Sequence, residues 1–203
     1  VACELAHLIY FKNPASNHRS LNWKRTIPEI TLNRGSFIRV FFSDFNNDGK
    51  PEVVAANKGE ENPDINNTTL NNISVYLLPD NPLEGDKWRE LVLTRVRIPI
   101  NSQPIDLDLD GDMDIVVGSR GERRILWLEN LGNFNFVEHE FNFSSKIEKD
   151  SWITGFNMDY ADLNDDGRLD IVSSVWPSSA YILFQPLNPE DKWDIKKIGS
   201  IDP

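Results

Sequence analysis

Cysteine is almost absent from this chain: its 203 residues include one, Cys3. A single cysteine leaves no partner for an intrachain disulfide, so we expect Cys3 to be a small buried apolar residue. The chain also lacks an apolar run of the roughly 20 residues that a membrane-spanning helix needs. Basic residues are scarce beside acidic ones, 21 against 32, which gives a net charge of −11. This balance argues against nucleic acid and anionic membranes as partners, because both require a basic face.

Residues typical of catalytic sites are also few. The three histidines, His7, His18 and His139, lie far apart in the sequence and have no partner at a ligand spacing, so we expect them to be structural or solvated. The sequence contains no Gly-x-Ser-x-Gly, no His-Glu-x-x-His and no paired cysteines. It therefore assigns no catalytic residue. The sequence leaves open whether the chain is an enzyme, and the missing motifs disfavour an enzymatic function.

The sequence does contain one nine-residue pattern three times, at 44–52, 106–114 and 162–170. Each copy reads Asp-x-Asp/Asn-x-Asp-Gly-x-x-Asp/Glu and is followed by a short apolar stretch. The glycines at position 6, Gly49, Gly111 and Gly167, are spaced by 62 and 56 residues. One copy alone could be an ordinary Asp-Gly turn, whereas three copies in register indicate a shared site.

Oxygen-bearing side chains at positions 1, 3, 5 and 9 can wrap a hard cation, and the glycine at position 6 permits the sharp bend. Calcium takes six to eight oxygen ligands at about 2.3–2.6 Å, and a backbone carbonyl at position 7 is a usual further ligand. Position 12, which holds a glutamate in helix-flanked calcium loops, is not acidic here, so the acid at position 9 replaces it. We therefore predict about three Ca²⁺ sites. Their ligands are Asp44, Asn46, Asp48, Lys50 and Glu52; Asp106, Asp108, Asp110, Asp112 and Asp114; and Asp162, Asn164, Asp166, Arg168 and Asp170, with Lys50, Asp112 and Arg168 contributing carbonyls.

The three sites are expected to differ in strength. The 106–114 loop is all aspartate at its ligand positions and should bind calcium best. The 44–52 loop has Glu52 where the others have aspartate, and Pro51 stiffens it. We therefore expect that loop to bind calcium most weakly.

Four short strand-like stretches surround each loop, rich in Val, Ile, Phe, Tyr and Trp and separated by turn residues. A repeated unit of four strands is typical of a β-propeller blade. The sequence thus predicts an all-β fold of four-stranded antiparallel blades over 1–203. The predicted units are a partial blade at 1–30 and full blades at 36–94, 103–141 and 152–198.

Three full blades and a partial one would leave apolar blade faces in water. We therefore expect this chain to be a segment of a larger propeller of about seven blades, completed by a longer chain or by a partner chain. The alternative is a small four-bladed ring closed by the partial blade.

These loops, repeated at blade spacing, resemble the FG-GAP/VCBS repeats of integrin-alpha-type propellers. Phe-Gly and Gly-Ala-Pro signatures are missing, so the VCBS-like branch fits better. The resemblance implies calcium loops between the first two strands of each blade, with side-chain ligands at positions 1, 3, 5 and 9. The pattern of an aromatic residue, a proline and a tryptophan after the loop (Tyr76, Pro82 and Trp88) is similar to that of secreted microbial and fungal propellers. Some of these bind sugars, and one group, similar to aldos-2-ulose dehydratases, carries out sugar chemistry.

Several features outside the loops are also notable, and two of them have two interpretations. Trp23, Trp88 and Trp193 recur at one blade position and are expected to pack between blades. Trp176 is either an exposed platform for a sugar ring or a buried loop anchor. The polar stretch 58–72 lengthens one loop and is either functional or simply solvated. Glycosylation sequons occur at Asn66, Asn67, Asn72 and Asn142.

Two functions follow as hypotheses. The first is a calcium-binding extracellular propeller, secreted or on the cell surface, that binds a protein or a glycan, as in adhesion. Millimolar extracellular calcium suits weak sites of about 10⁻⁴–10⁻³ M. The second is the propeller domain of a secreted carbohydrate-active enzyme, of lyase or dehydratase type, whose catalytic groups lie outside this segment.

Overall fold

The computed structural model describes residues 7–17, 19 and 22–200. The expectations for Cys3 and His18 lie outside this range. The described chain is built of antiparallel strands and three short 3₁₀ helices, η1 (Ala15–Asn17), η2 (Glu29–Thr31) and η3 (Gly85–Lys87). None of the described helices has the length and apolar character needed to cross a membrane.

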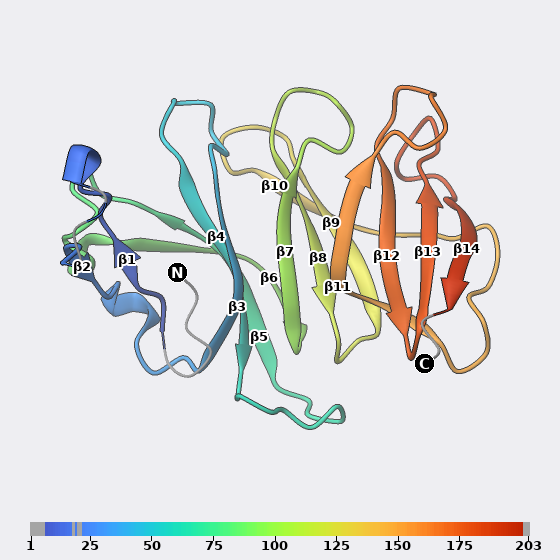
Figure 1. Cartoon of the computed structure of the whole chain (residues 1–203), viewed down its shortest axis with the longest axis horizontal. Helices are drawn as coiled ribbons and strands as arrows, with labels where there is room; N and C mark the ends of the chain where they lie inside the picture. Colours follow the sequence, from blue (N-terminus) through green and yellow to red (C-terminus); the bar gives the residue numbers. More distant parts are fainter. Residues whose placement is uncertain (1–6, 18, 20–21, 201–203) are drawn as a thin grey trace.

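The strands form one two-stranded and three four-stranded sheets (Figure 1). The small sheet pairs β1 (Tyr10–Phe11) with β2 (Arg25–Thr26). The first large sheet contains β3 (Ser36–Ser43), β4 (Glu52–Gly59), β5 (Leu70–Leu77) and β6 (Arg89–Arg97). The second contains β7 (Pro99–Ile105), β8 (Asp114–Ser119), β9 (Arg124–Asn130) and β10 (Phe136–Glu140). The third contains β11 (Trp152–Ala161), β12 (Asp170–Trp176), β13 (Ser179–Phe184) and β14 (Asp194–Ser200).

Consecutive strands pair within every large sheet, so each is an antiparallel four-stranded meander. This is the arrangement of a propeller blade, and it confirms the predicted all-β, blade-built fold. The sheets follow one another in a row, with the two-stranded sheet at one end and the third large sheet at the other (Figure 1). The described residues therefore do not form the alternative four-bladed ring. Completion by further blades stays a prediction.

Alternation of side chains along the second strands explains how the sheets stack. In β4, Val54 and Ala56 join a buried cluster with Ile115 and Val117 of β8. The intervening Val53 and Ala55 face the opposite way, into a cluster with Leu8 and Trp88. Successive strand residues point to opposite faces, so a strand packed on both faces needs an almost continuous apolar run.

The second and third large sheets share another buried cluster. Val116 of β8 and Trp127 of β9 pack there with Ile171 and Leu183 of the third sheet and with Trp193, just before β14. Trp88 and Trp193 are buried, as expected for tryptophans between blades. The same expectation is wrong for Trp23, which is 37% exposed beside the short sheet of β1 and β2. A two-stranded sheet offers too little surface to cover it.

The long polar loop is shorter than the predicted 58–72. Lys58 and Gly59 extend β4, and Leu70 begins β5. Asn71 and Asn72 can form part of β5 because their side chains form hydrogen bonds. Asn72 Nδ2 donates to Glu90 Oε1 at 3.2 Å, and Asn71 Nδ2 donates to the Lys58 carbonyl at 3.4 Å.

The two edges of the row carry different connections. The three acidic loops join the first and second strands of their sheets and lie along the upper edge (Figure 1). The connections β4–β5, β8–β9 and β12–β13 lie along the opposite edge. The first strands β3, β7 and β11 are neighbours across the sheets.

Candidate metal centre

The three acidic loops share one backbone conformation. The residue at position 4 has a positive φ in each loop, and so does the glycine at position 6. The φ values at position 4 are 57° for Asn47, 63° for Leu109 and 61° for Asp165, and those at position 6 are 82° for Gly49, 98° for Gly111 and 84° for Gly167. Glycine adopts such angles without the Cβ clash that other residues suffer. The repeated sequence pattern therefore corresponds to a repeated curl of the chain.

Backbone amides hold the acidic side chains inside this curl. The N–H of each position-6 glycine donates to the position-1 aspartate, at 2.7 Å for Gly49 and Asp44, 3.2 Å for Gly111 and Asp106, and 2.8 Å for Gly167 and Asp162. The N–H at position 7 donates to the position-5 aspartate, at 2.8 Å in the first two loops and 3.0 Å in the third. The side chains at positions 1 and 5 are thus oriented by the loop itself.

The middle loop gathers three carboxylates. Asp106, Asp108 and Asp110 each offer one oxygen, and these oxygens lie within 4.8 Å of one another. Burial, followed by the charges of Asp110, Glu129 and Asp106, raises the pKa of the Asp108 carboxyl, although a hydrogen bond from the Asp110 N–H opposes this shift. Like charges this close repel one another, and a cation among them would offset that repulsion.

One oxygen of this group, Asp106 Oδ1, is buried and accepts no hydrogen bond from the described part of the chain. A buried carboxylate oxygen without a partner is costly, and such charges are normally paired or coordinate a metal. The residues present in the middle loop therefore fit a hard cation, with Asp106, Asp108 and Asp110 as the side chains that would hold it.

The flanking loops satisfy their acids internally. At position 3 they carry asparagine, whose amide donates to the position-5 aspartate: Asn46 to Asp48 at 3.2 Å and Asn164 to Asp166 at 2.8 Å. The position-1 Oδ1 also has a donor in both loops, the N–H at position 5, at 3.1 Å. Arg168 forms a further ion pair with Asp166. In the third loop, the N–H of Gly167 leads the hydrogen bonds that lower the pKa of Asp162.

The position-9 acids lie beneath the loops, outside the group of three carboxylates. Glu52, Asp114 and Asp170 are buried, and each accepts the N–H of position 2, at 3.0, 3.1 and 3.1 Å. Asp114 and Asp170 also accept an N–H from the end of the third strand, from Asn130 at 2.8 Å and Gln185 at 2.9 Å.

These acids thus tie each loop to its own sheet, and burial raises the pKa of Glu52 and raises that of Asp114 to about 7. Their role as calcium ligands stays a prediction, as does that of the carbonyls of Lys50, Asp112 and Arg168.

Two amide side chains connect the loops to the next sheet. Asn130 Nδ2 donates to the Phe45 carbonyl at 2.9 Å, and Gln185 Nε2 donates to the Leu107 carbonyl at 2.8 Å. Phe45 and Leu107 occupy position 2, and their side chains are buried in the core shared with that next sheet. The sequence did not predict this contact, and its only local signal is an amide side chain at the end of each third strand.

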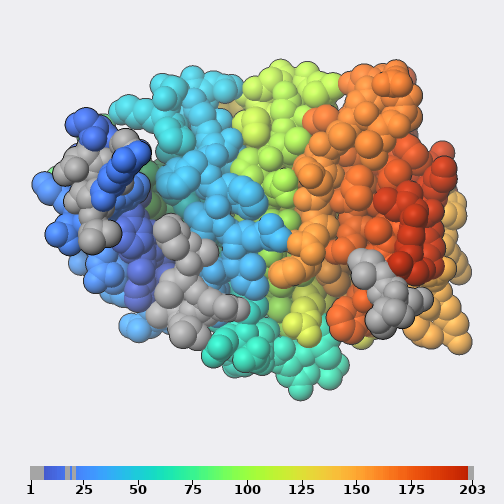
Figure 2. Space-filling view, in the orientation of Figure 1, coloured from blue at the N-terminus to red at the C-terminus, as the bar shows by residue number. Residues whose placement is uncertain are grey.

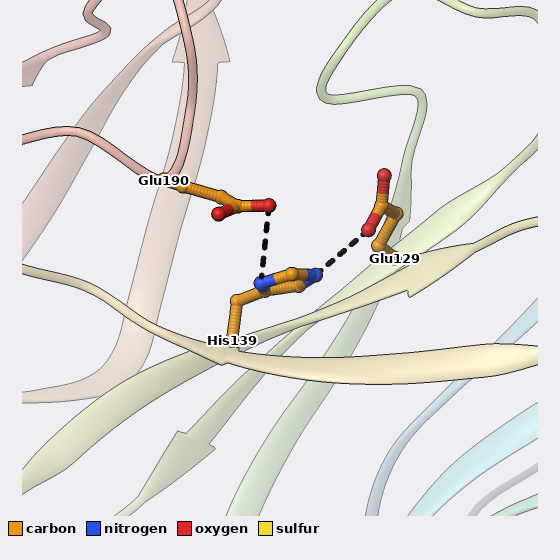
Figure 3. A group of neighbouring side chains, drawn as sticks. All are labelled: Glu129, His139 and Glu190. Atoms are coloured by element: carbon orange, nitrogen blue, oxygen red, sulfur yellow. Dashed lines mark hydrogen bonds and ion pairs between the residues drawn. The ribbon is translucent and has the colours of Figure 1, made fainter.

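His139 has acidic partners that its sequence spacing did not indicate. Its Nε2 lies 2.7 Å from Glu129 Oε2, and its Nδ1 lies 3.8 Å from Glu190 Oε1 (Figure 3). Its ring also stacks on Trp127, with centroids 4.7 Å apart. Glu129 lies in β9 and Glu190 in the connection between β13 and β14 of the next sheet, so no linear motif could reveal the group. The sequence predicted a structural or solvated histidine, and a structural role agrees with a ring that has partners in two sheets.

A row of four-stranded meanders, each with an acidic loop between its first two strands, defines a β-propeller-type repeat protein. Residues 106–173 match the family model of the FG-GAP-like repeat. The chain therefore contains an FG-GAP-like repeat, which confirms the resemblance drawn from its sequence. The match begins at the middle acidic loop and ends just after the third. A search of curated proteins finds no match.

Proposed function

We propose that this chain is a calcium-binding propeller-type module that works outside the cell and binds a protein or a glycan. The observation that carries the calcium assignment is the middle loop, where three carboxylates converge and the buried Asp106 Oδ1 has no hydrogen-bond donor among the described residues. Calcium fits this donor set better than magnesium, which keeps more of its water and needs fewer protein oxygens.

Bound calcium would neutralise the charges of the loop carboxylates. The contacts between each loop and the sheets would then transmit the stabilising effect of the ion. Each loop is held to its own sheet by the position-9 acid, which accepts the N–H of position 2. The first two loops also insert a side chain, Phe45 or Leu107, into the core of the next sheet. A loop held rigid by an ion therefore stabilises the packing between sheets. On this proposal the loops serve the scaffold, and ligand binding takes place elsewhere on the molecule.

Chelation is the direct test. A ligand that binds only the folded state stabilises it by about 2.7 kcal/mol when its free concentration is about 100 times its Kd. For a chain of this size we expect calcium to raise the melting temperature by about 5–10 °C. Calorimetry with millimolar calcium or with a chelator measures this difference, and magnesium should reproduce only part of it.

The matched variants are Asp106→Ala, in the middle loop, and Asp191→Ala, an acid outside all three loops. We expect Asp106→Ala to remove the largest share of the calcium-dependent shift and Asp191→Ala to leave it intact. A melting temperature that chelator and calcium leave unchanged would refute the calcium assignment.

A further inference from the structure

A cavity of about 620 Å³ lies at the edge of the row opposite the acidic loops. Its walls come from all three large sheets: Ile65 from the β4–β5 loop, Arg120 and Arg123 from the β8–β9 connection, and Trp152 and Trp176 from β11 and β12. Figure 2 shows these connections side by side along the lower edge, in blue-green, yellow-green and orange. A concave, mostly apolar site of this size, shared by several structural units, is the usual form of a small-ligand site.

One wall of this cavity is a stack of three side chains, two tryptophans and an arginine. Trp152 and Trp176 are cross-strand partners, with ring centroids 6.2 Å apart and planes inclined by 25°. The guanidinium of Arg123 lies 4.1 Å from the Trp152 ring. Trp176, the other end of the stack, is 56% exposed. The alternative of a buried loop anchor is therefore wrong for Trp176, whose ring forms an open flat wall.

Among the described residues that line the cavity, those with charged side chains are all basic. They are Lys58, Arg120 and Arg123, in a chain of net charge −11. Among the described residues, neither Arg120 nor Arg123 forms an ion pair. Arginine binds carboxylates through two parallel hydrogen bonds, and the arginine stacked on Trp152 is held ready to do so.

We propose that this cavity binds an acidic oligosaccharide, one whose sugar rings carry carboxylates. One face of a pyranose ring presents C–H bonds, which suit the open ring of Trp176. The carboxylate suits Arg123 and Arg120, and the sugar hydroxyls suit the hydroxyls of Thr154, Ser174 and Ser178 that also line the cavity. This proposal rests on the module's proposed role as a binding protein and specifies its ligand.

Tetragalacturonate is a suitable probe, because its methyl ester has the same sugar rings without the charges. Calorimetric titration of the whole chain in calcium should show binding of the acid, and the ester should bind at least about tenfold more weakly, a difference of about 1.4 kcal/mol. Raising the salt concentration should weaken binding of the acid. A peptide of aspartates tests whether charge alone is recognised.

Variants separate the two parts of the site. Trp176→Ala and Arg123→Gln should each weaken binding at least about tenfold, whereas Trp176→Phe should keep most of it because a flat ring remains. Trp23→Ala and Arg95→Gln are matched controls for an exposed tryptophan and an exposed arginine outside the cavity, and both should bind normally. Circular dichroism establishes that each variant is folded.

The proposal is wrong if folded protein fails to bind the acid, binds the ester equally well, or binds the aspartate peptide as tightly. It is also wrong if Trp176→Ala and Arg123→Gln both bind the acid normally. The calcium-dependent melting shift, measured on the same samples, keeps the two proposals apart. A normal shift without saccharide binding rejects the saccharide site alone, and saccharide binding without a shift rejects the calcium assignment alone.

Discussion

The middle and third acidic loops share one sequence pattern and one backbone conformation, yet the hydrogen bonds to their acidic side chains differ. In the middle loop, position 3 is Asp108, and one oxygen of Asp106 is buried without a donor from the described chain. In the third loop, position 3 is Asn164, which donates to Asp166, and Arg168 pairs with the same aspartate. If the proposed function is correct, the middle loop needs an added cation, whereas the third loop supplies its own hydrogen bonds and positive charge.

The two loops also differ in what covers them. Leu107, at position 2 of the middle loop, is fully buried in the core of the next sheet, and the Gln185 amide binds its carbonyl. Leu163, at position 2 of the third loop, is 45% exposed. The shared backbone thus comes from the local pattern of glycine and aspartate. The coupling of a loop to the rest of the molecule comes from a neighbouring sheet.

The largest expected effect comes from position 2, where Leu107 is buried and Leu163 is exposed. We expect Leu107→Ala to lower the free energy of unfolding by about 2–5 kcal/mol, because it leaves a cavity between two sheets. Leu163→Ala removes the same atoms from an exposed position and should change stability by no more than about 0.5 kcal/mol. Urea unfolding of both variants in chelator measures the two values. Equal losses would show that the loop itself, and not the neighbouring sheet, determines the role of position 2.

An exchange at position 3 gives the next largest effect. Asp108→Asn gives the middle loop the asparagine of its neighbours, and Asn164→Asp gives the third loop the missing charge. Two charges about 4 Å apart interact by about 1–4 kcal/mol near a protein surface. We therefore expect Asp108→Asn to weaken calcium binding at least about tenfold and to stabilise the metal-free protein. Asn164→Asp should do the reverse.

Each exchange needs a background in which only one loop binds calcium. Alanine at position 1 of the other two loops, Asp44→Ala with Asp162→Ala or with Asp106→Ala, provides it. Calorimetric titration then gives one affinity, and urea unfolding in chelator gives the stability without metal. If both exchanges left calcium affinity unchanged, the charge at position 3 would not explain the difference between the loops.

Local patterns predicted the blades and the course of the loops well. The short apolar runs after the acidic loops indicated β4 and β8, and the aspartate-glycine pattern indicated a curl that the φ angles of Gly49, Gly111 and Gly167 display. Both depend on residues close together in the chain. A short apolar run bounded by turn residues needs only its own sequence to indicate a strand, and a tight turn needs only its own glycine.

Contacts between sheets could not be predicted in the same way. Asn130 reaches Phe45 across 85 residues, and His139 meets Glu190 from another sheet. The stack of Arg123, Trp152 and Trp176 joins two sheets as well. Such pairs are fixed by how the sheets pack, and no spacing within one segment encodes them. Trp23 was misjudged for the same reason, because burial depends on the size of the neighbouring sheet.

The smallest expected effect comes from the position-6 glycine, which the middle and third loops share. Gly111 and Gly167 have φ values of 98° and 84°, and a Cβ added to either would meet no atom within 4 Å. Alanine at these positions would therefore suffer conformational strain alone, about 1–2 kcal/mol. We expect Gly111→Ala and Gly167→Ala to lower the free energy of unfolding by equal amounts, within about 0.5 kcal/mol.

Gly199 is the control for this comparison, because its added Cβ would also lie in open space but its φ is outside the positive region. Gly199→Ala should leave stability unchanged or raise it by up to about 1 kcal/mol. Urea unfolding in chelator measures all three variants without the contribution of the ion. A much larger loss for Gly111→Ala than for Gly167→Ala would mean that the loops differ in backbone as well as in charge. The contrast between them could then no longer be assigned to Asp108 and Asn164 alone.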